Sequence, residues 1–255
     1  MARYQVILAY DGSQFQGFQR QSRSDTVQGA VEASLRELGW DGRSILAAGR
    51  TDAGVHAIGQ VIAFDFDWMH SVDDLQAAMN ACMPPSISVQ AVAEAHDSFH
   101  PRYDAQVRCY RYHIFCQPVR HPLRERYAWR VWPAVDVDRM VEAANLISGR
   151  HDFAAFGSPP RAGSSTLRTV FRSAWRLVDG PWEIPDLAYE IAADGFLFRM
   201  VRRLVYLQIA IGQGRMEPEE VARHLETPPV SPIQGLAPPN GLILVRVDYD
   251  RVGSS

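Results

Sequence analysis

The chain of 255 residues contains no lysine, so all 26 of its basic residues are arginines. This absence excludes Schiff-base catalysis by a lysine amine and the phosphate-binding loop that depends on lysine. A GC-rich genome that replaces lysine by arginine explains the absence, but it does not explain where the arginines cluster. Because arginine pairs with phosphate and stacks on bases, its exclusive use suits an RNA partner.

Other features that the chain lacks narrow its class. It has no run of about 18 apolar residues, so we expect no membrane-spanning helix, and its first residues lead directly into strand-like sequence and do not resemble a signal peptide. The three cysteines, Cys82, Cys109 and Cys116, cannot all pair and lack metal-type spacing with histidine. We therefore expect reduced thiols in a cytoplasmic protein without a metal site. No nucleophile-elbow, zinc-protease or dinucleotide-binding motif occurs, so a generic hydrolase is a distant alternative.

The charges are unevenly distributed although the net charge is only −3. Between Asp52 and His100 there is no arginine, and aspartates and glutamates accumulate there. Residues 101–130 show the reverse, with arginines at these positions: Arg102, Arg108, Arg111, Arg120, Arg124, Arg126 and Arg130. A chain with one acidic and one arginine-rich stretch can bind a polyanion despite its overall balance.

One glycine-containing loop between two strand-like runs carries the sharpest chemical signal. Its sequence is Gly49-Arg50-Thr51-Asp52-Ala53-Gly54-Val55-His56. Small residues flank Asp52, so nothing bulky screens its carboxylate, and flanking strands make a rigid support for a site. The alternative is structural: Asp52 caps a turn and Arg50 forms a surface ion pair.

Three other segments bear on chemistry, each with two interpretations. In residues 99–112, aromatic residues and arginines interleave as in surfaces that stack bases, but Tyr110 and Tyr112 also fit a half-buried strand. Arg199 and Arg202 are three apart in an apolar helix-like segment, where a buried guanidinium needs a carboxylate such as Asp52 unless the side chain reaches solvent. Residues 236–242 either line a pocket or form a simple turn.

The hydrophobic pattern predicts an α+β fold. Strands are expected at residues 4–10, 43–48, 60–66 and 87–95, with helices at 26–38 and 72–82. This β-α-β-β-α-β order is that of the ferredoxin-like split unit. A similar order follows, with strands at residues 107–117, 127–131, 169–178, 187–193 and 242–248 and helices at 136–146, 196–211 and 218–225. Since no low-complexity linker separates the two halves, we expect one continuous sheet.

Short motifs occur along nearly the whole chain: Leu8-Ala9-Tyr10-Asp11-Gly12, Gly17-Phe18-Gln19, Thr26-Val27-Gln28-Gly29, the run from Gly49 to Gln60, Tyr110-Arg111-Tyr112 and Asp194-Gly195-Phe196-Leu197. In this order they resemble the tRNA pseudouridine synthase A family. The Arg50-Thr51-Asp52 core occurs more widely among pseudouridine synthases, whereas the full set is specific to the A type. Arg203, Tyr206 and a long, proline-rich loop at residues 156–167 depart from the family pattern.

The resemblance implies a fold of two ferredoxin-like βαββαβ halves that share one mostly antiparallel sheet with helices on one face. Residues 1–105 would form the N-terminal half with the catalytic loop. Residues 106–255 would complete the cleft and supply the dimer interface. The family isomerises uridine to pseudouridine in the tRNA anticodon arm, at positions 38, 39 and 40, as a homodimer without cofactor or metal.

The resemblance also implies roles for individual residues. Asp52 would be the catalytic carboxylate, and Arg50 or Arg202 would keep it ionised and oriented. Tyr110 would stack on the target base and move a proton late in the reaction. The alternative is a non-catalytic RNA-binding module on the same scaffold, in which the arginine-rich residues 101–130 bind the RNA.

Overall fold

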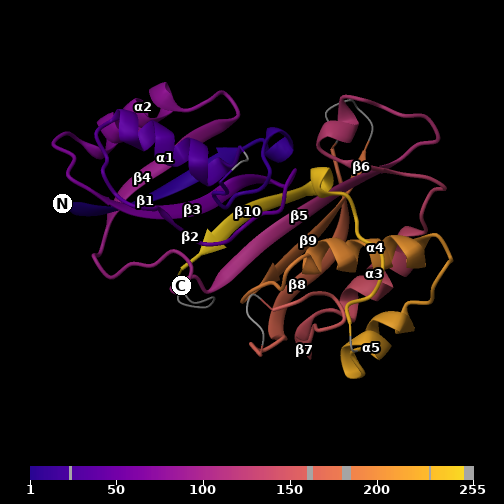
Figure 1. Ribbon diagram of the computed structural model, residues 1–255. Coiled ribbons are helices and arrows are strands. Elements are labelled where there is room, and N and C mark those ends of the chain that lie inside the picture. The colour runs from indigo at the N-terminus through magenta and orange to yellow at the C-terminus, as the bar shows by residue number, and fades with distance from the viewer. Residues whose placement is uncertain (23–24, 160–162, 180–184, 230, 250–255) are drawn as a thin grey trace. The chain divides into compact units, whose positions relative to one another are not determined.

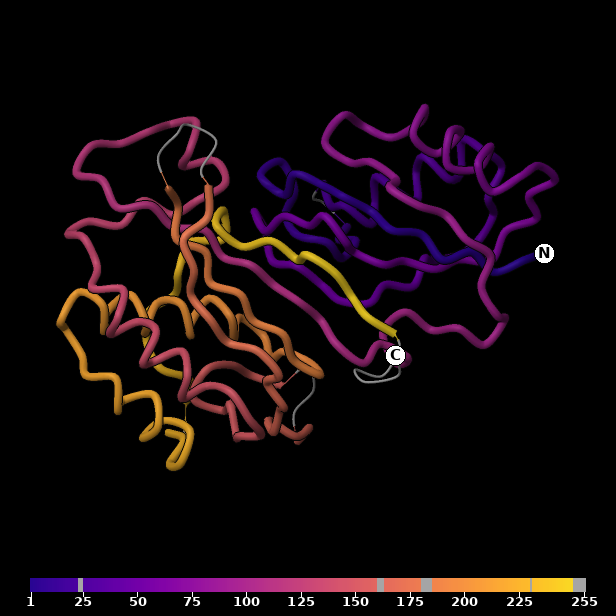
Figure 2. Tube along the Cα trace, turned by 180° about the vertical axis from the view of Figure 1, so that it is seen from behind, coloured from indigo at the N-terminus to yellow at the C-terminus, as the bar shows by residue number. Residues whose placement is uncertain are grey.

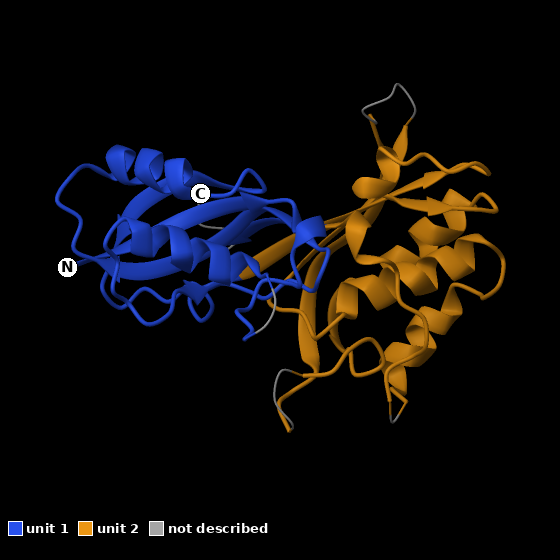
Figure 3. Cartoon of the chain, turned by 45° about the horizontal axis from the view of Figure 1, so that its top comes forward, with its two compact units in different colours: residues 1–106, 243–255 blue, residues 107–242 orange. Residues whose placement is uncertain are grey.

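The computed structural model describes residues 1–22, 25–159, 163–179, 185–229 and 231–249 (Figure 1). The chain forms two compact units, coloured separately in Figure 3. The first contains Met1–Gln106 and Ile243–Ser255, and the second contains Val107–Leu242. Each unit is an α+β structure with its own core, and each is described by itself below.

Antiparallel strands form the sheet of the first unit in the order β4-β1-β3, and β10 follows β3. The strand β10 is part of the yellow C-terminal trace in Figure 2. The strands are β1 (Ala2–Tyr10), β2 (Leu46–Ala47), β3 (His56–Phe66), β4 (Ile87–Ala95) and β10 (Leu242–Asp248). The short β2 pairs antiparallel with β3, and β10 is parallel to β3 at Ile243 and His56. From Tyr4 onward, buried and half-buried residues alternate along β1, and the side chains of Tyr4, Val6 and Leu8 face the core.

Two helices, α1 (Val27–Glu37) and α2 (Val72–Cys82), cover one face of this sheet (Figure 1). Ser34 Oγ of α1 donates to the backbone oxygen of Cys82 at 3.0 Å, which joins the two helices. The side chain of Thr26 caps α1 by accepting from the N–H of Gly29 at 3.3 Å. Ser71 and Asp74 form a capping box at the start of α2.

The second unit is built on antiparallel strands in the order β5-β9-β8-β7, with β6 parallel to β5. Its strands are β5 (Val107–Cys116), β6 (Trp129–Val131), β7 (Gly149–Asp152), β8 (Leu167–Val178) and β9 (Asp186–Ala193). Its helices are α3 (Val137–Asn145), α4 (Met200–Gly212) and α5 (Glu219–Glu226). Three short 3₁₀ helices complete the described chain: η1 (Gly12–Gln14), η2 (Arg124–Arg126) and η3 (Pro239–Gly241).

Buried hydrogen bonds attach the helices to one face of the sheet in the second unit. Ser173 Oγ donates to the backbone oxygen of Ala144 at 2.7 Å and shares a 2.8 Å hydrogen bond with the hydroxyl of Tyr189. Trp175 Nε1 donates to Gln208 Oε1 of α4 at 2.7 Å. Each of these four buried polar side chains therefore has a hydrogen-bond partner, as burial requires.

The other face of that sheet carries charge. Glu190 of β9 accepts from Arg111 of β5 at 2.9 Å and pairs with Arg172 and Arg176 of β8. Burial raises the pKa of Glu190, but its hydrogen bonds and charge interactions with the arginines outweigh burial and hold the pKa below its usual value. Three guanidinium groups around one carboxylate leave this face with an excess of positive charge.

The α+β class with a mostly antiparallel arrangement is confirmed. The predicted strand at residues 43–48 shrinks to Leu46–Ala47, because Ser44 and the backbone of Ile45 bind a side chain of α1 instead of a strand partner. The strand β7 was not predicted. Residues 160–162 of the long loop at 156–167 lie outside the described residues. Among the described residues, no helix is long and apolar enough to cross a membrane.

Candidate active site

Asp52 lies in the loop between β2 and β3, which we call the Asp52 loop (residues 49–55). Its side chain is half-buried, and the neighbouring Ala53 is exposed. The N–H of Val55 donates to the backbone oxygen of Asp52 at 3.1 Å, which closes a turn, and Gly54 has a φ of 77° that favours glycine. The turn therefore presents the carboxylate from a compact backbone bend.

Residues 15–18 hold the Asp52 loop on both sides of Asp52. The N–H of Phe18 donates to the backbone oxygen of Thr51 at 3.1 Å, and the N–H of Gly54 donates to the backbone oxygen of Phe15 at 3.4 Å. Gly17 lies between them with a φ of 94°, and a Cβ built there would be 3.0 Å from the oxygen of Thr51. Close backbone approach thus requires glycine at this position.

The end of β1 supports the same loop from the core. The hydroxyl of Tyr10 and Oγ1 of the buried Thr51 share a hydrogen bond of 2.8 Å. The N–H of Gly12 donates to Nδ1 of His56 at 3.0 Å, and a Cβ on Gly12 would be 2.0 Å from the oxygen of Val55. Because these supports are buried, the backbone around Asp52 is held by packing as well as by hydrogen bonds.

The start of the loop is attached to β3. The N–H of Ala48 donates to the backbone oxygen of Val61 at 2.8 Å. The fully buried Gln60 donates from Nε2 to the backbone oxygen of Gly49 at 3.0 Å. Arg50 follows this attachment with an exposed side chain, so Arg50 and Asp52 share one loop but differ in burial.

Tyr110 belongs to the second unit, on β5, where it is half-buried and lies opposite Ile191 of β9. Its ring meets that of Phe196 edge to face, with centroids 5.1 Å apart and an interplanar angle of 88°. Such a geometry is favourable for aromatic pairs and restricts how the tyrosine ring can turn.

Arg202 also lies in the second unit, in the first turn of α4, and is only 8% exposed. Its Nε donates to the backbone oxygen of Ala237 at 2.7 Å, and the hydroxyl of Tyr112 donates to the next carbonyl, that of Pro238, at 2.7 Å. Burial raises the pKa of Tyr112 well above its usual value, with a smaller opposing effect of Arg202. The turn at residues 236–242 is thus held by a buried cation and a buried hydroxyl.

Arg199 does not share a helical face with Arg202, which corrects the prediction of a helix over residues 196–211. The helix α4 begins at Met200, and Arg199 precedes it with a φ of 63°. The guanidinium of Arg199 lies 4.7 Å from the ring centroid of Phe198. The left-handed backbone at Arg199 breaks the helical phase on which the prediction depended.

Two buried polar residues, Gln28 and Glu32, were not predicted to have a functional role. Both are buried on α1, and both form hydrogen bonds to segments next to the Asp52 loop. Their spacing of four residues could have indicated a polar pair on one face of the helix, next to its apolar stripe. Burying such a pair is costly unless both side chains are hydrogen-bonded.

Comparison with known proteins gives consistent results over nearly the whole chain. The protein-family model described as tRNA pseudouridine synthase matches residues 6–104 and 143–250 of this chain. The chain is 38% identical to tRNA pseudouridine synthase A of Brevibacillus brevis, over 98% of this chain and 100% of the relative. It is 36% identical to the protein of the same name from Pseudothermotoga lettingae, over 98% and 100% of the two chains. The Chloroflexus aurantiacus protein of that name is 38% identical over 96% of this chain and 87% of its own length.

Proposed function

Because the chain belongs to the tRNA pseudouridine synthase family, we propose that it isomerises uridine to pseudouridine in tRNA. The match over nearly the full length of named relatives is the observation that carries this proposal. The target uridines are those of the anticodon arm, at positions 38, 39 and 40, as the family resemblance implies. The enzyme acts as a cytoplasmic homodimer and needs no cofactor or metal.

Asp52 is the catalytic carboxylate in this proposal. The reaction breaks the bond between N1 of uracil and C1′ of the ribose, turns the base and joins C5 to C1′. The C5 hydrogen then leaves as a proton, and N1 takes up a proton, so that the product is an isomer of uridine. A carboxylate starts this sequence either by attacking covalently or by taking a proton from the sugar.

The firm support of the Asp52 loop favours this role. Proximity catalysis requires the reacting group to be held in a productive geometry, and a displacement of about 1 Å can cost a factor of about 10² in rate. The backbone on both sides of Asp52 is bonded to residues 15–18, and Thr51 is bonded to Tyr10. A carboxylate that served only as a surface cap would not need such support.

Tyr110, Arg50 and Arg202 are proposed to bind the substrate. Tyr110 stacks on the target base, which must leave its helical stack at a cost of about a few kcal/mol. Aromatic stacking and arginine–phosphate contacts offset that cost. Arg50, which shares the Asp52 loop, steadies the carboxylate of Asp52, and its exposed side chain is suited to meet RNA as well.

The test compares Asp52→Asn with Asp73→Asn, a matched control at an exposed position in the first turn of α2. Both changes remove one negative charge. We expect Asp52→Asn to bind tRNA as the parent does and to lower tritium release from tRNA containing 5-tritiated uridine by at least about 10²-fold. The Asp73→Asn variant should keep both properties.

The alternative, a non-catalytic RNA-binding module, predicts a different result. It allows tRNA binding in every variant but no tritium release by the parent protein. Release that persists in Asp52→Asn would contradict the role of Asp52. Parent-like activity of Tyr110→Phe would argue only against proton transfer by its hydroxyl, since the ring that stacks is kept.

A further inference from the structure

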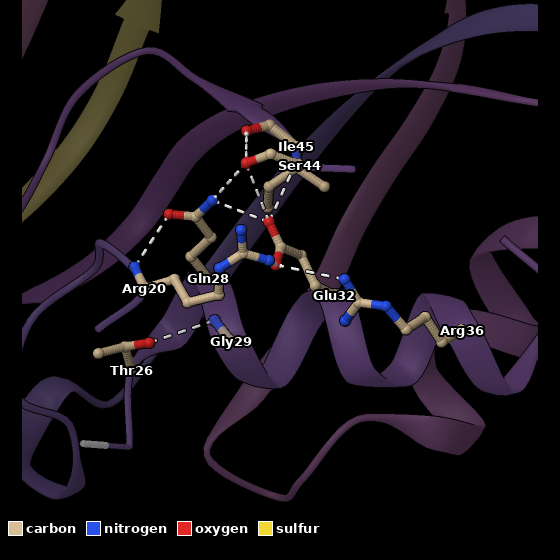
Figure 4. A network of polar contacts seen from close by, with 8 residues as sticks. All are labelled: Arg20, Thr26, Gln28, Gly29, Glu32, Arg36, Ser44 and Ile45. Atoms are coloured by element: carbon tan, nitrogen blue, oxygen red, sulfur yellow. Dashed lines mark hydrogen bonds and ion pairs between the residues drawn. The ribbon is translucent and has the colours of Figure 1, made fainter. Parts of the chain in front are cut away.

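Glu32 is a buried acid that the proposed reaction does not use. It lies in the middle of α1, and its side chain is 0% exposed. A buried carboxylate is costly unless it is paired and hydrogen-bonded. The contacts of Glu32 therefore show what it stabilises, and Figure 4 shows them converging on its two oxygens.

One oxygen of Glu32 binds the segment that leads into β2. Oε1 accepts a hydrogen bond from the N–H of Ile45 at 3.2 Å and one from Ser44 Oγ at 3.2 Å. Gln28 Nε2 donates to the same oxygen at 2.8 Å and also to Ser44 Oγ at 2.9 Å (Figure 4). These bonds hold Ser44 and Ile45 on the helix, just before the chain reaches the Asp52 loop.

The other oxygen of Glu32 binds arginines. Oε2 accepts a hydrogen bond from NH1 of Arg20, and NH2 of Arg36 lies 3.7 Å away (Figure 4). The backbone N–H of Arg20 donates to Gln28 Oε1 at 3.0 Å. Both the main chain and the side chain of Arg20 are thus attached to α1 through the Gln28–Glu32 pair.

These two attachments lie on the two segments that flank the Asp52 loop. Arg20 ends the segment whose residues Phe15 and Phe18 bond to Gly54 and Thr51, on either side of Asp52. Ile45 precedes β2, whose end is bonded to β3, and the Asp52 loop follows directly. The carboxylate of Glu32 therefore connects residues 15–20, which bond to the Asp52 loop, with the segment that leads into β2 and then into that loop.

We propose that Glu32 is a positioning residue for Asp52, acting through Arg20 and Ile45 without touching the substrate. This inference rests on the catalytic role proposed for Asp52. Its physical basis is that both oxygens of a carboxylate accept hydrogen bonds, whereas an amide of the same size accepts with one oxygen and donates with its nitrogen.

Glu32→Gln tests that basis with little change of volume. The glutamine oxygen can still accept from Gln28, Ser44 and Ile45, but its NH₂ group then faces the guanidinium of Arg20. Two donors cannot hydrogen-bond each other, so Arg20 is released and the segment at residues 15–20 loses one attachment. Arg36→Gln is the matched control, because Arg36 contacts the same oxygen but belongs to neither segment.

Single-turnover tritium release should separate chemistry from binding. We expect Glu32→Gln to lower the rate of the chemical step by about 10- to 100-fold, as expected for a displaced reacting group, while the Kd for tRNA changes less than about twofold. Arg36→Gln should leave both within about twofold of the parent. A Glu32→Gln variant that loses affinity and keeps its chemical rate would overturn the proposal.

Hydrogen exchange gives a second readout that does not depend on activity. In Glu32→Gln the amides of Phe18 and Gly54, which bond to the backbone around Asp52, should exchange faster. The amides of Val6 and Ile62, which lie in the paired strands β1 and β3, should exchange as in the parent. Unchanged exchange at Phe18 and Gly54 would overturn the proposal.

Two further experiments distinguish a failure of this inference from a variant that does not fold and from a failure of the proposed function. If Glu32→Gln does not fold, the double variant Glu32→Gln with Arg20→Gln, which removes both charges, takes its place with the same expected outcomes. A parent protein that binds tRNA but releases no tritium would refute the proposed function. In that case, faster exchange at Phe18 and Gly54 would still show that Glu32 holds the loop.

Discussion

Gly17 offers a direct test of whether the backbone around Asp52 must be held in place. Gly17 has a φ of 94° and is buried against the Asp52 loop, whereas Gly39 has a φ of 92° and is exposed after α1. Alanine at either position is strained, because L side chains rarely adopt this backbone conformation, at a cost of about 1–2 kcal/mol. The two substitutions thus share one energetic effect.

They differ in what the new Cβ meets. At Gly17 the Cβ would be 3.0 Å from the backbone oxygen of Thr51 and 3.3 Å from the backbone nitrogen of Ala53, the residues on either side of Asp52. Backbone atoms at such distances must move by a few tenths of an ångström. At Gly39 nothing lies within 4 Å of the Cβ. Since a 1 Å displacement costs about 10²-fold, we expect Gly17→Ala to lower the chemical rate by about threefold to tenfold.

The assay combines urea unfolding with tritium release at saturating tRNA. Gly39→Ala should lose about 1–2 kcal/mol of unfolding free energy, and Gly17→Ala should lose at least as much. Only Gly17→Ala should lose chemical rate when both are assayed well below their unfolding midpoints. Equal chemical rates for the two variants, each measured well below its unfolding midpoint, would refute the claim that a rigid loop positions Asp52.

Two other predictions concern ion pairs of different burial. Arg124→Met should lower the unfolding free energy by about 3–5 kcal/mol, because it leaves the carboxylate of Asp186 uncompensated where both side chains are at most 8% exposed. The double variant with Asp186→Leu should recover most of that loss in urea unfolding, and a single variant that costs under about 1 kcal/mol would contradict this. At the surface, the hydrogen bonds from Arg3 lower the pKa of Asp65. This pair therefore stabilises the fold above about pH 4, and the stabilisation is lost as the pH falls through the lowered pKa. Asp65→Asn should therefore cost less than about 1 kcal/mol at pH 7 and nothing at pH 2, and an equal cost at both would argue against this linkage.

Local sequence predicted those elements whose boundaries depend on local interactions. The helix α2 (Val72–Cys82) and the strand β4 (Ile87–Ala95) have the predicted bounds. A serine cap precedes the helix, and Pro84-Pro85 follows it, so both of its ends are marked in the sequence. For the same reason the position of Asp52 between strand-forming runs could be predicted without a structure.

Elements whose limits depend on distant residues were harder to predict. The helix α4 starts at Met200, four residues later than predicted, because the backbone at Arg199 turns left-handed. The strand β7 forms through pairing with β8, and its four residues carry little strand signal of their own. At β7, non-local pairing overrides local propensity.

The sequence by itself determined the family, the α+β class and the loop that bears Asp52, because motifs and hydrophobic periodicity are local properties of the chain. Only the tertiary structure decided how that loop is held. Gly17 approaches its backbone closely, Tyr10 hydrogen-bonds to Thr51, and Glu32 bonds to the two segments that flank the loop. These contacts join residues from separate parts of the chain, and such contacts exist only once the elements have packed together.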